Sequence, residues 1–330
     1  MVEKHIRDIL SIAMEYTDAR KAVVVFDTRS PLAVTLTEAY RRCLPKANFI
    51  DFDNVAPKDI LLSLELLEPL DLVVLIQSTS FRLEAFRIRV DLFNRSIKVI
   101  EHPHLSNMQG LELQYYVNSL AYDPVYYRGV GAALKIRIDR ARSGTIESGG
   151  ECLEFTSGFE SAKLNVGDYT QMKNVGGQFP IGEVFTEARD LESVNGRVRV
   201  FAFGDTAFKV NKPEQSITLT VSKGRVTDTA DSTFEFDKVL ANIRTDEGEV
   251  WVRELGFGLN RALTQERIVS DIGTYERMCG VHLSLGAKHT IYKKPQFTRR
   301  ESRHHVDVFA STKTVTLDND VVYKNNAWQA

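Results

Sequence analysis

Four segments in the second half of the chain place an acid or an imidazole inside an apolar or glycine-rich run. They read GGQFPIGEVFTEA, VRELGFGLN, GVHLSLGAKH and SRHHVDVF. A charged carboxylate in such surroundings is costly unless it is paired, hydrogen-bonded or bound to a metal ion. The side chains that these segments offer as metal ligands are Glu183, Glu254, His282, His289, His305 and Asp307.

The stretch RHHVDVF indicates which of two adjacent histidines would face a metal ion. Side chains alternate along a strand, so His305 and Asp307 point to one face and His304 points to the other. A histidine and an aspartate on one face form a compact chelate with one nitrogen and one oxygen. In VRELGFGLN and GVHLSLG, glycines share a face with Glu254 and His282. We expect these glycines to leave open space for a ligand or substrate.

Each segment also has a simpler interpretation. A single carboxylate in a strand is commonly a rim residue or the partner in a salt bridge. A single histidine commonly takes part in hydrogen bonds alone, and His304 with His305 could form a polar strand edge. The occurrence of four such segments in one region favours a metal site, although no local motif such as HExxH is present.

The same four segments resemble motifs of the leucyl aminopeptidase / aminopeptidase T family of bacterial metallopeptidases. FPIGEVFTEA resembles the family's N-L-P-x-G-E-V-F element, and RELGFGLN resembles E-x-G-x-G-x-N. GVHLSLG resembles G-T-x-H-x-A-x-G, and SRHHVDV resembles S-x-x-H-x-D. All four occur in the family's order. The segments before them resemble the family's amino-terminal domain, so the resemblance covers most of the chain.

The resemblance implies two divalent metal ions in a β-rich carboxy-terminal domain. Its ligands would be Glu183, Glu254, His282, His305 and Asp307. The clearest departure is His289, which stands where the family has a tyrosine ligand; an imidazole can bind a metal but is neutral. This departure bears on whether a second ion binds. Three carboxylates with two or three imidazoles suit zinc, cobalt, manganese or iron(II), and are too rich in nitrogen for calcium.

The activity that the resemblance implies is that of a metallo-aminopeptidase, which removes amino-terminal residues from short peptides. Metal ions would activate a water molecule and polarise the scissile carbonyl. Glu276, six residues before His282, is a candidate general base or a charge on a helix surface. The alternatives are a mononuclear iron(II) ring-cleaving dioxygenase of the same superfamily, acting on a dihydroxypyridine-type substrate, and a non-peptidase biosynthetic or binding relative. Glu254 favours the peptidase, and His289 favours the dioxygenase.

The elements before these motifs alternate between strands and helices. KAVVVF, ANFIDF, DLVVLIQ and KVIEHP predict buried strands, with helices between them, and Ser30-Pro31 predicts the start of one such helix. This pattern favours an open, mostly parallel α/β sheet over residues 1–141. The loop DTRSPLA lacks the glycines of a phosphate-binding loop, so we expect a scaffold rather than a nucleotide-binding domain.

From residue 142 the chain consists of short strands and glycine turns. SKGRV and TKTVTLDNDVVY predict hairpins, and FDKVLANIR predicts a helix. We therefore expect residues 142–330 to form a β-rich catalytic domain that binds the metal. The predicted fold class is α/β plus α+β, with an amino-terminal parallel sheet and a carboxy-terminal metal-binding domain.

Composition limits the partners and the location. The 330 residues carry a formal net charge of -2, so no global field attracts nucleic acid or an anionic membrane. Three separated cysteines without a CxxC motif favour a reducing cytoplasm over a disulfide framework or a thiolate zinc site. The first residues lack the apolar core of a signal peptide, and no stretch is apolar enough to span a membrane. The expected substrate is a short peptide or another small molecule, and the resemblance implies a homodimer.

Overall fold

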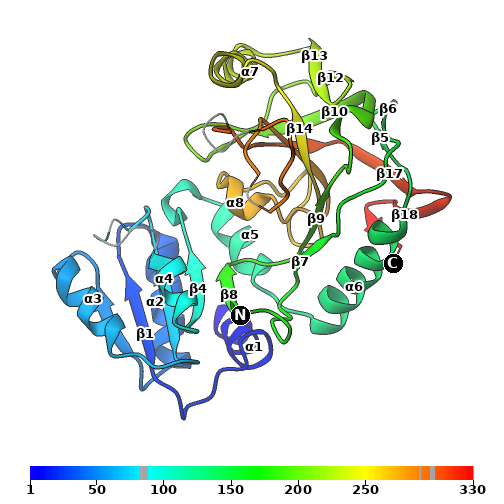
Figure 1. Cartoon of the computed structure of the whole chain (residues 1–330). Helices are drawn as coiled ribbons and strands as arrows, with labels where there is room; N and C mark the ends of the chain where they lie inside the picture. Colours follow the sequence, from blue (N-terminus) through cyan, green and yellow to red (C-terminus); the bar gives the residue numbers. More distant parts are fainter. Residues whose placement is uncertain (82, 84–87, 290, 298–301, 330) are drawn as a thin grey trace. The chain divides into compact units, whose positions relative to one another are not determined.

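The computed structural model describes residues 1–81, 83, 88–289, 291–297 and 302–329. The chain divides into two compact units, each formed from two stretches (Figure 1). The first unit contains Met1–Arg128 and Gly167–Ile181, and the second contains Gly129–Val166 and Gly182–Ala330. The boundary after residue 141 stays a prediction, since compactness alone does not define a functional domain.

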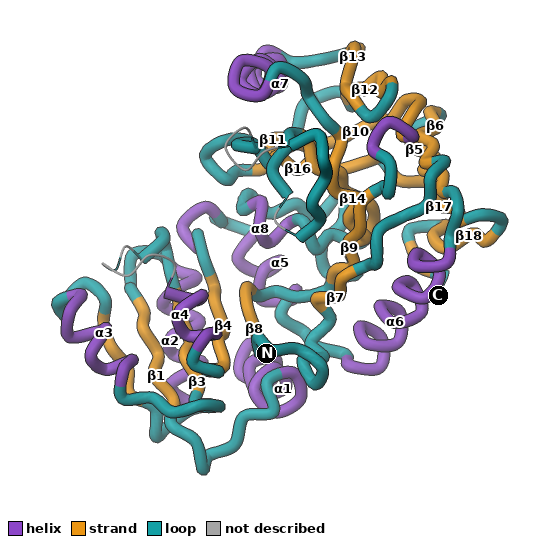
Figure 2. Tube along the Cα trace, in the orientation of Figure 1, coloured by secondary structure: helices purple, strands orange, loops and turns teal. Residues whose placement is uncertain are grey.

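The first unit is built on a parallel sheet with the strand order β2-β1-β3-β4-β8, of which Figure 2 labels β1, β3, β4 and β8. The strands are β1 (Ala22–Phe26), β2 (Asn48–Asp51), β3 (Leu72–Ile76), β4 (Lys98–His102) and β8 (Gly176–Gln178). The first four match the strands predicted from the sequence. Strand β8 was not predicted, because it is three residues long and contains two glycines. A Cβ atom at Gly176 would lie 1.9 Å from the carbonyl oxygen of Val99, so only glycine allows this pairing.

Helices precede the first strand of this sheet and lie between the later ones. They are α1 (Val2–Asp8), α2 (Pro31–Cys43), α3 (Pro57–Glu65), α4 (Ile88–Asn94) and α5 (Glu112–Ser119), with a π-helical turn over Ile9–Ala13 after α1. Helix α2 begins where the Ser30-Pro31 pair predicted, and the Ser30 hydroxyl accepts a hydrogen bond from the Ala33 amide. The first residues of the predicted segment LEAFRIRVDLF lie partly outside the described residues, and α4 covers its second part.

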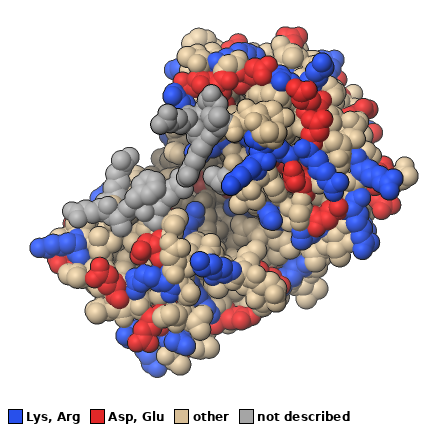
Figure 3. Space-filling view, viewed as in Figure 1, with Lys and Arg blue, Asp and Glu red and all other residues tan. Residues whose placement is uncertain are grey.

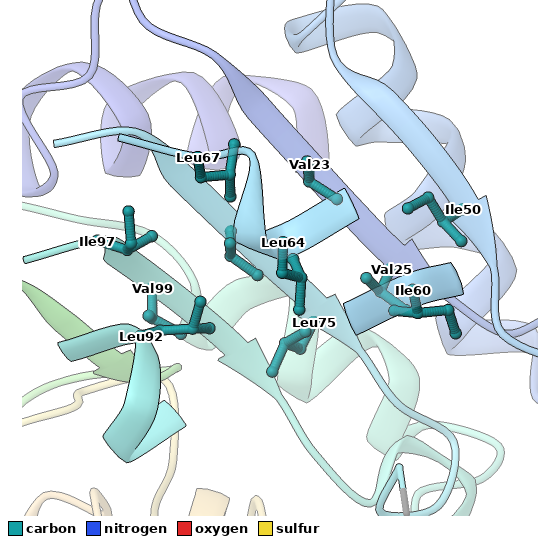
Figure 4. Close-up of a cluster of buried hydrophobic side chains, with 11 residues drawn as sticks. Val23, Val25, Ile50, Ile60, Leu64, Leu67, Leu75, Leu92, Ile97 and Val99 are labelled. Carbon is teal, nitrogen blue, oxygen red and sulfur yellow. The ribbon is translucent and has the colours of Figure 1, made fainter. Parts of the chain in front are cut away.

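A hydrophobic core fills one face of the parallel sheet (Figure 4). Alternate residues of the strands, such as Val23 and Val25 of β1, point to this face. Ile60 and Leu64 of α3 and Leu92 of α4 pack against them. Strands β1 and β3 are buried along their whole length, which explains why their sequences are continuously apolar.

The second unit contains a large sheet of 14 strands among its described residues. Its main path has the order β19-β18-β17-β5-β6-β10-β16-β15-β14-β9-β7, with β11, β12 and β13 attached through β10. The strands are β5 (Gly144–Ser148), β6 (Glu151–Phe155), β7 (Lys163–Asn165), β9 (Glu183–Glu187), β10 (Val194–Gly204), β11 (Val210–Asn211), β12 (Ile217–Ser222), β13 (Arg225–Ala230), β14 (Val252–Gly258), β15 (Gly280–Leu285), β16 (Val306–Ala310), β17 (Thr312–Leu317), β18 (Asp320–Lys324) and β19 (Ala327–Trp328).

The local predictions for this unit are confirmed. Strands β12 and β13 form the SKGRV hairpin, with Lys223 and Gly224 at positive φ, and β17 and β18 form the last hairpin. Helix α7 (Phe234–Glu247) covers FDKVLANIR and begins at Thr233, whose hydroxyl accepts from the Phe236 amide. Two further helices are α6 (Pro124–Arg140) and α8 (Ile272–Tyr275), and α8 precedes the candidate site residue Glu276.

The chain is an α/β protein with a parallel sheet in one unit and a large antiparallel sheet in the other, as the sequence predicted. No helix within the described parts of the chain has the length and apolarity needed to cross a membrane. On the face shown in Figure 3, basic side chains are interspersed with acidic ones, in keeping with a net charge of -2.

Candidate metal centre

Four adjacent strands of the second unit bring the four motifs together. Strands β9, β14, β15 and β16 are neighbours in that order. In the register, Glu183 lies opposite Gly258, and His282 lies opposite Gly256. Asp307 lies opposite Ser284 on the next strand. Motifs that are far apart in the chain therefore become cross-strand neighbours on one face of the sheet.

The structure groups the candidate ligands into two overlapping sets. Glu183, Glu254 and His282 form one set, and Glu276, His282 and Asp307 form the other. Within each set, the oxygen and nitrogen atoms that could bind a metal lie within 4.8 Å of one another. His282 belongs to both sets, which makes this histidine the centre of the cluster.

The imidazole of His282 is the most deeply buried candidate ligand, with 1% of its side chain exposed. Its Nε2 lies 3.3 Å from Oε1 of Glu183 and 3.6 Å from Oε1 of Glu254. Among the described residues, neither ring nitrogen has a hydrogen-bond partner with acceptable geometry. Burial lowers the pKa of His282, but the surrounding carboxylates outweigh this effect and raise it well above the usual range. The cluster therefore favours a positive charge at this ring.

His102 of the first unit shows how a buried histidine is ordinarily satisfied. The hydroxyl groups of Tyr40 and Tyr116 lie 2.9 and 2.7 Å from its two ring nitrogens. No carboxylate competes with burial there, and the pKa of His102 falls to about 3. Unlike His102, His282 is surrounded by carboxylates, which favour a positive charge at its ring.

Glycines make room for the site itself. A Cβ atom at Gly256 would lie 2.0 Å from Cε1 and 2.1 Å from Nε2 of His282. A Cβ atom at Gly258 would lie 1.9 Å from the carbonyl oxygen of Met278. At Gly286 it would lie 2.4 Å from the carbonyl oxygen of His304. The expectation that these glycines leave open space for a ligand is thus wrong, because protein atoms fill the space beside each of them.

Glu254 is held by its neighbours on a β-bulge. The pairing of β14 with β15 shifts register between Val252 and Leu255, and the Glu254 amide donates to Oγ of Ser284 at 2.9 Å. The Oε2 atom of Glu254 lies 2.7 Å from Nε2 of His289. Burial raises the pKa of Glu254, but nearby imidazoles outweigh it and hold the carboxyl pKa well below the usual range.

The ring of His289 uses both nitrogens within the protein. The amides of Ile291 and Tyr292 donate to its Nδ1 at 3.2 and 3.4 Å. Because Nδ1 accepts, the proton lies on Nε2, which donates to Glu254. In this arrangement His289 orients Glu254, and its direct ligation of a metal stays a prediction.

His304 and His305 face different surroundings, although both precede β16, which begins at Val306. Nε2 of His305 lies 3.1 Å from Oδ1 of Asp307, whereas Nε2 of His304 lies 2.7 Å from Oδ2 of Asp246 on α7. Nδ1 of His305 lies 3.1 Å from the carbonyl oxygen of Lys288. Although burial lowers the pKa of His305, the charge and hydrogen bond of Asp307 raise it to about 10.

Glu276 follows α8 and lies inside the cluster rather than on a helix surface. Only 19% of its side chain is exposed, and it shares a candidate ligand set with His282 and Asp307. Burial raises the pKa of Glu276 to about 8; the adjacent Arg277 opposes the rise, and nearby carboxylates add to it. A carboxyl group with a pKa near neutrality can both accept and release a proton, which suits a general base.

Arg277 is a member of the cluster that the sequence motifs did not indicate. Its NH1 atom lies 2.8 Å from Oε2 of Glu183 and is also ion-paired with Glu276. Its side chain is 7% exposed. Arg277 was difficult to predict as a site residue, because an arginine next to a glutamate in the sequence ordinarily lies on the surface.

A second buried ion pair supports the loop that carries His289. The Arg253 guanidinium pairs with Glu187, and the two side chains are 2% and 0% exposed. Arg253 also donates to the carbonyl oxygens of Ala287 and Tyr292, and its guanidinium lies 4.5 Å from the ring centroid of Phe297. These contacts fix the chain on both sides of His289.

The donor set fits a divalent transition metal. Buried carboxylate oxygens converge with an imidazole that has no hydrogen-bond partner in the described structure, and buried Oδ1 of Asp307 lies 3.1 Å from Nε2 of His305. Mixed oxygen and nitrogen donors suit zinc, manganese, cobalt or iron(II). Glu183, Glu254 and His282 could hold such an ion, with Asp307, His305 and Glu276 beside them.

Comparison with known proteins supports the fold. No family model matches the chain, and no curated protein matches it in sequence. Among solved structures, wild-type AmpT from Thermus thermophilus is similar, with a TM-score of 0.56 and 12% sequence identity. The match covers 100% of this chain and 99% of that chain. At this identity the similarity shows a shared fold over the whole length.

Proposed function

We propose that the protein is a metal-dependent aminopeptidase that hydrolyses amino-terminal residues of short peptides. The observation that carries the proposal is the His282 imidazole, which is buried between the carboxylates of Glu183 and Glu254 without a hydrogen-bond partner in the described structure. The fold shared with AmpT, an aminopeptidase T, supports the same class of reaction.

The residues of the cluster have distinct roles in this proposal. A divalent ion held there would polarise the scissile carbonyl of the substrate and would lower the pKa of a bound water molecule. Glu276 would take the proton from the attacking water, since it lies beside the candidate ligands and its pKa is raised to about 8. Glu254 would be oriented by His289 and by the Ser284 hydroxyl. A free carboxylate oxygen of the cluster would pair with the amino group of the substrate.

The test combines elemental analysis with peptide hydrolysis. The protein is purified without chelator, its metal content is measured, and release of the first residue from short peptides is followed by mass spectrometry. We expect zinc, cobalt or manganese, cleavage that stops with chelator, and no cleavage of peptides whose amino terminus is acetylated. Failure of the protein to bind any metal after reconstitution would contradict the proposal.

A dioxygenase is the second candidate, and the imidazole of His289 beside Glu254 is the observation that favours it. The cluster nevertheless contains four carboxyl groups, namely Glu183, Glu254, Glu276 and Asp307. Facial iron(II) sites of oxygenases have two histidines and one carboxylate, so this cluster suits hydrolysis better. If the protein held one iron ion per chain and consumed oxygen with a dihydroxylated heteroaromatic substrate, the dioxygenase would become the favoured function.

A further inference from the structure

The candidate centre contains a fixed organic cation. NH1 of Arg277 lies 2.8 Å from Oε2 of Glu183 and contacts Oε1 of Glu276 at closer range. These two carboxylates belong to different candidate ligand sets, so the guanidinium links the two sets. Arg277 is the second residue after the short helix α8 and is 6% exposed, so it cannot turn away into solvent without rearrangement of its neighbours.

We propose that the centre binds one divalent metal ion, through Glu183, Glu254 and His282, and that the Arg277 guanidinium takes the place of a second ion between Glu183 and Glu276. The inference rests on the proposed metal-dependent function and gives its stoichiometry. It departs from the two-ion centre that the sequence resemblance implies.

The first argument concerns the shared imidazole. Both candidate sets include His282. Its Nε2 is the nitrogen that lies 3.3 Å from Glu183 and 3.6 Å from Glu254. A neutral imidazole has one lone pair for a metal ion, so His282 can complete only one of the sets. The other set is then left with the carboxylates of Glu276 and Asp307, which could hold a second ion only if no other cation occupied the position beside Glu276.

The second argument concerns charge. An arginine side chain does not lose its proton in a protein, so the cation at Arg277 is permanent. Paired metal ions of hydrolases stand about 3.5–4 Å apart. NH1 of Arg277 is ion-paired with Glu276, so a second divalent ion bound by Glu276 would lie close to NH1. The region is buried, and like charges repel strongly there. We expect this repulsion to weaken binding of a second ion by at least about 100-fold.

The third argument concerns Glu276. Its ion pair with Arg277 places one carboxylate oxygen toward the guanidinium. A carboxylate oxygen of Glu276 also lies within 4.8 Å of ligand atoms of His282 and Asp307. Arg277 would therefore act as a positioning residue that keeps Glu276 available for proton transfer instead of metal ligation.

The experiment is a metal titration of chelator-treated protein with Mn²⁺ or Zn²⁺, read by equilibrium dialysis and elemental analysis. Wild type is expected to bind one ion per chain tightly, with the Mn²⁺ electron paramagnetic resonance spectrum of an isolated ion. R277M removes the cation and is expected to bind two ions, with the spectrum of a spin-coupled pair. R277K keeps the charge and is expected to bind one.

The outcomes separate this inference from the proposed function. Two ions in wild type, or one ion in R277M, would overturn the role of Arg277 while leaving metal-dependent hydrolysis in place. No bound ion in wild type would overturn the function and this inference with it. Circular dichroism monitors folding of each variant; should R277M fail to fold, R277Q replaces it and the wild-type stoichiometry still decides the one-ion claim.

Discussion

At the scale of single residues, two adjacent histidines differ in what they face. His305 lies 3.1 Å from Asp307 in the cluster, and His304 lies 2.7 Å from Asp246 on α7. We expect His305→Ala and Asp307→Ala to weaken Zn²⁺ binding by roughly 10–100-fold, as is typical of residues that lie beside the metal ligands. His304→Ala, the matched control, should change Zn²⁺ affinity by less than about threefold. Isothermal titration calorimetry measures all three; a larger loss for His304→Ala would contradict this orientation of the strand.

Gly256 lies so close to the His282 ring that a side chain does not fit at this position. A Cβ atom there would lie 2.0 Å from the His282 ring, so Gly256→Ala must displace the imidazole. We expect a loss of about 1–3 kcal/mol in stability from overpacking and a loss of metal binding. Gly129→Ala is the control, because its Cβ would meet nothing within 4 Å and α6 is helical there. Urea denaturation should show no loss of stability for the control; equal destabilisation of both variants would count against the steric explanation.

At the scale of elements, period-two alternation predicted that His305 faces Asp307 and that His304 does not; the contacts of the two rings agree, although both histidines precede β16. It was not enough to bring Glu183, Glu254 and His282 together, because that depends on the order of strands in the sheet. Four motifs in a familiar order supplied this information through the family resemblance. Alternation also could not show that the space beside Gly256 is filled by the His282 ring, since packing across strands is not encoded by one strand.

The buried Arg253 guanidinium supports the chain near the site, since it donates to the carbonyl oxygens of Ala287 and Tyr292. Arg253→Met would leave Glu187, which is 0% exposed, without its partner. We expect a loss of about 3–5 kcal/mol in the free energy of unfolding. The matched control is Arg197→Met, because the Arg197–Glu151 pair is 49% and 24% exposed and should contribute less than about 1 kcal/mol. Chemical denaturation of both variants tests this, and similar losses would show that burial of the pair is unimportant.

At the scale of the whole molecule, the centre joins segments from residue 183 to residue 307 of the second unit. An ion that binds only the folded state stabilises it, by about 2.7 kcal/mol at 100 times the dissociation constant. For a unit of this size we expect Zn²⁺ to raise the melting temperature of chelator-treated protein by at least about 5 °C. His282→Ala should abolish the rise, whereas His304→Ala should retain it. Because unfolding must separate β9, β14, β15 and β16, a bound ion that left the melting temperature unchanged would mean that the ion binds outside these strands.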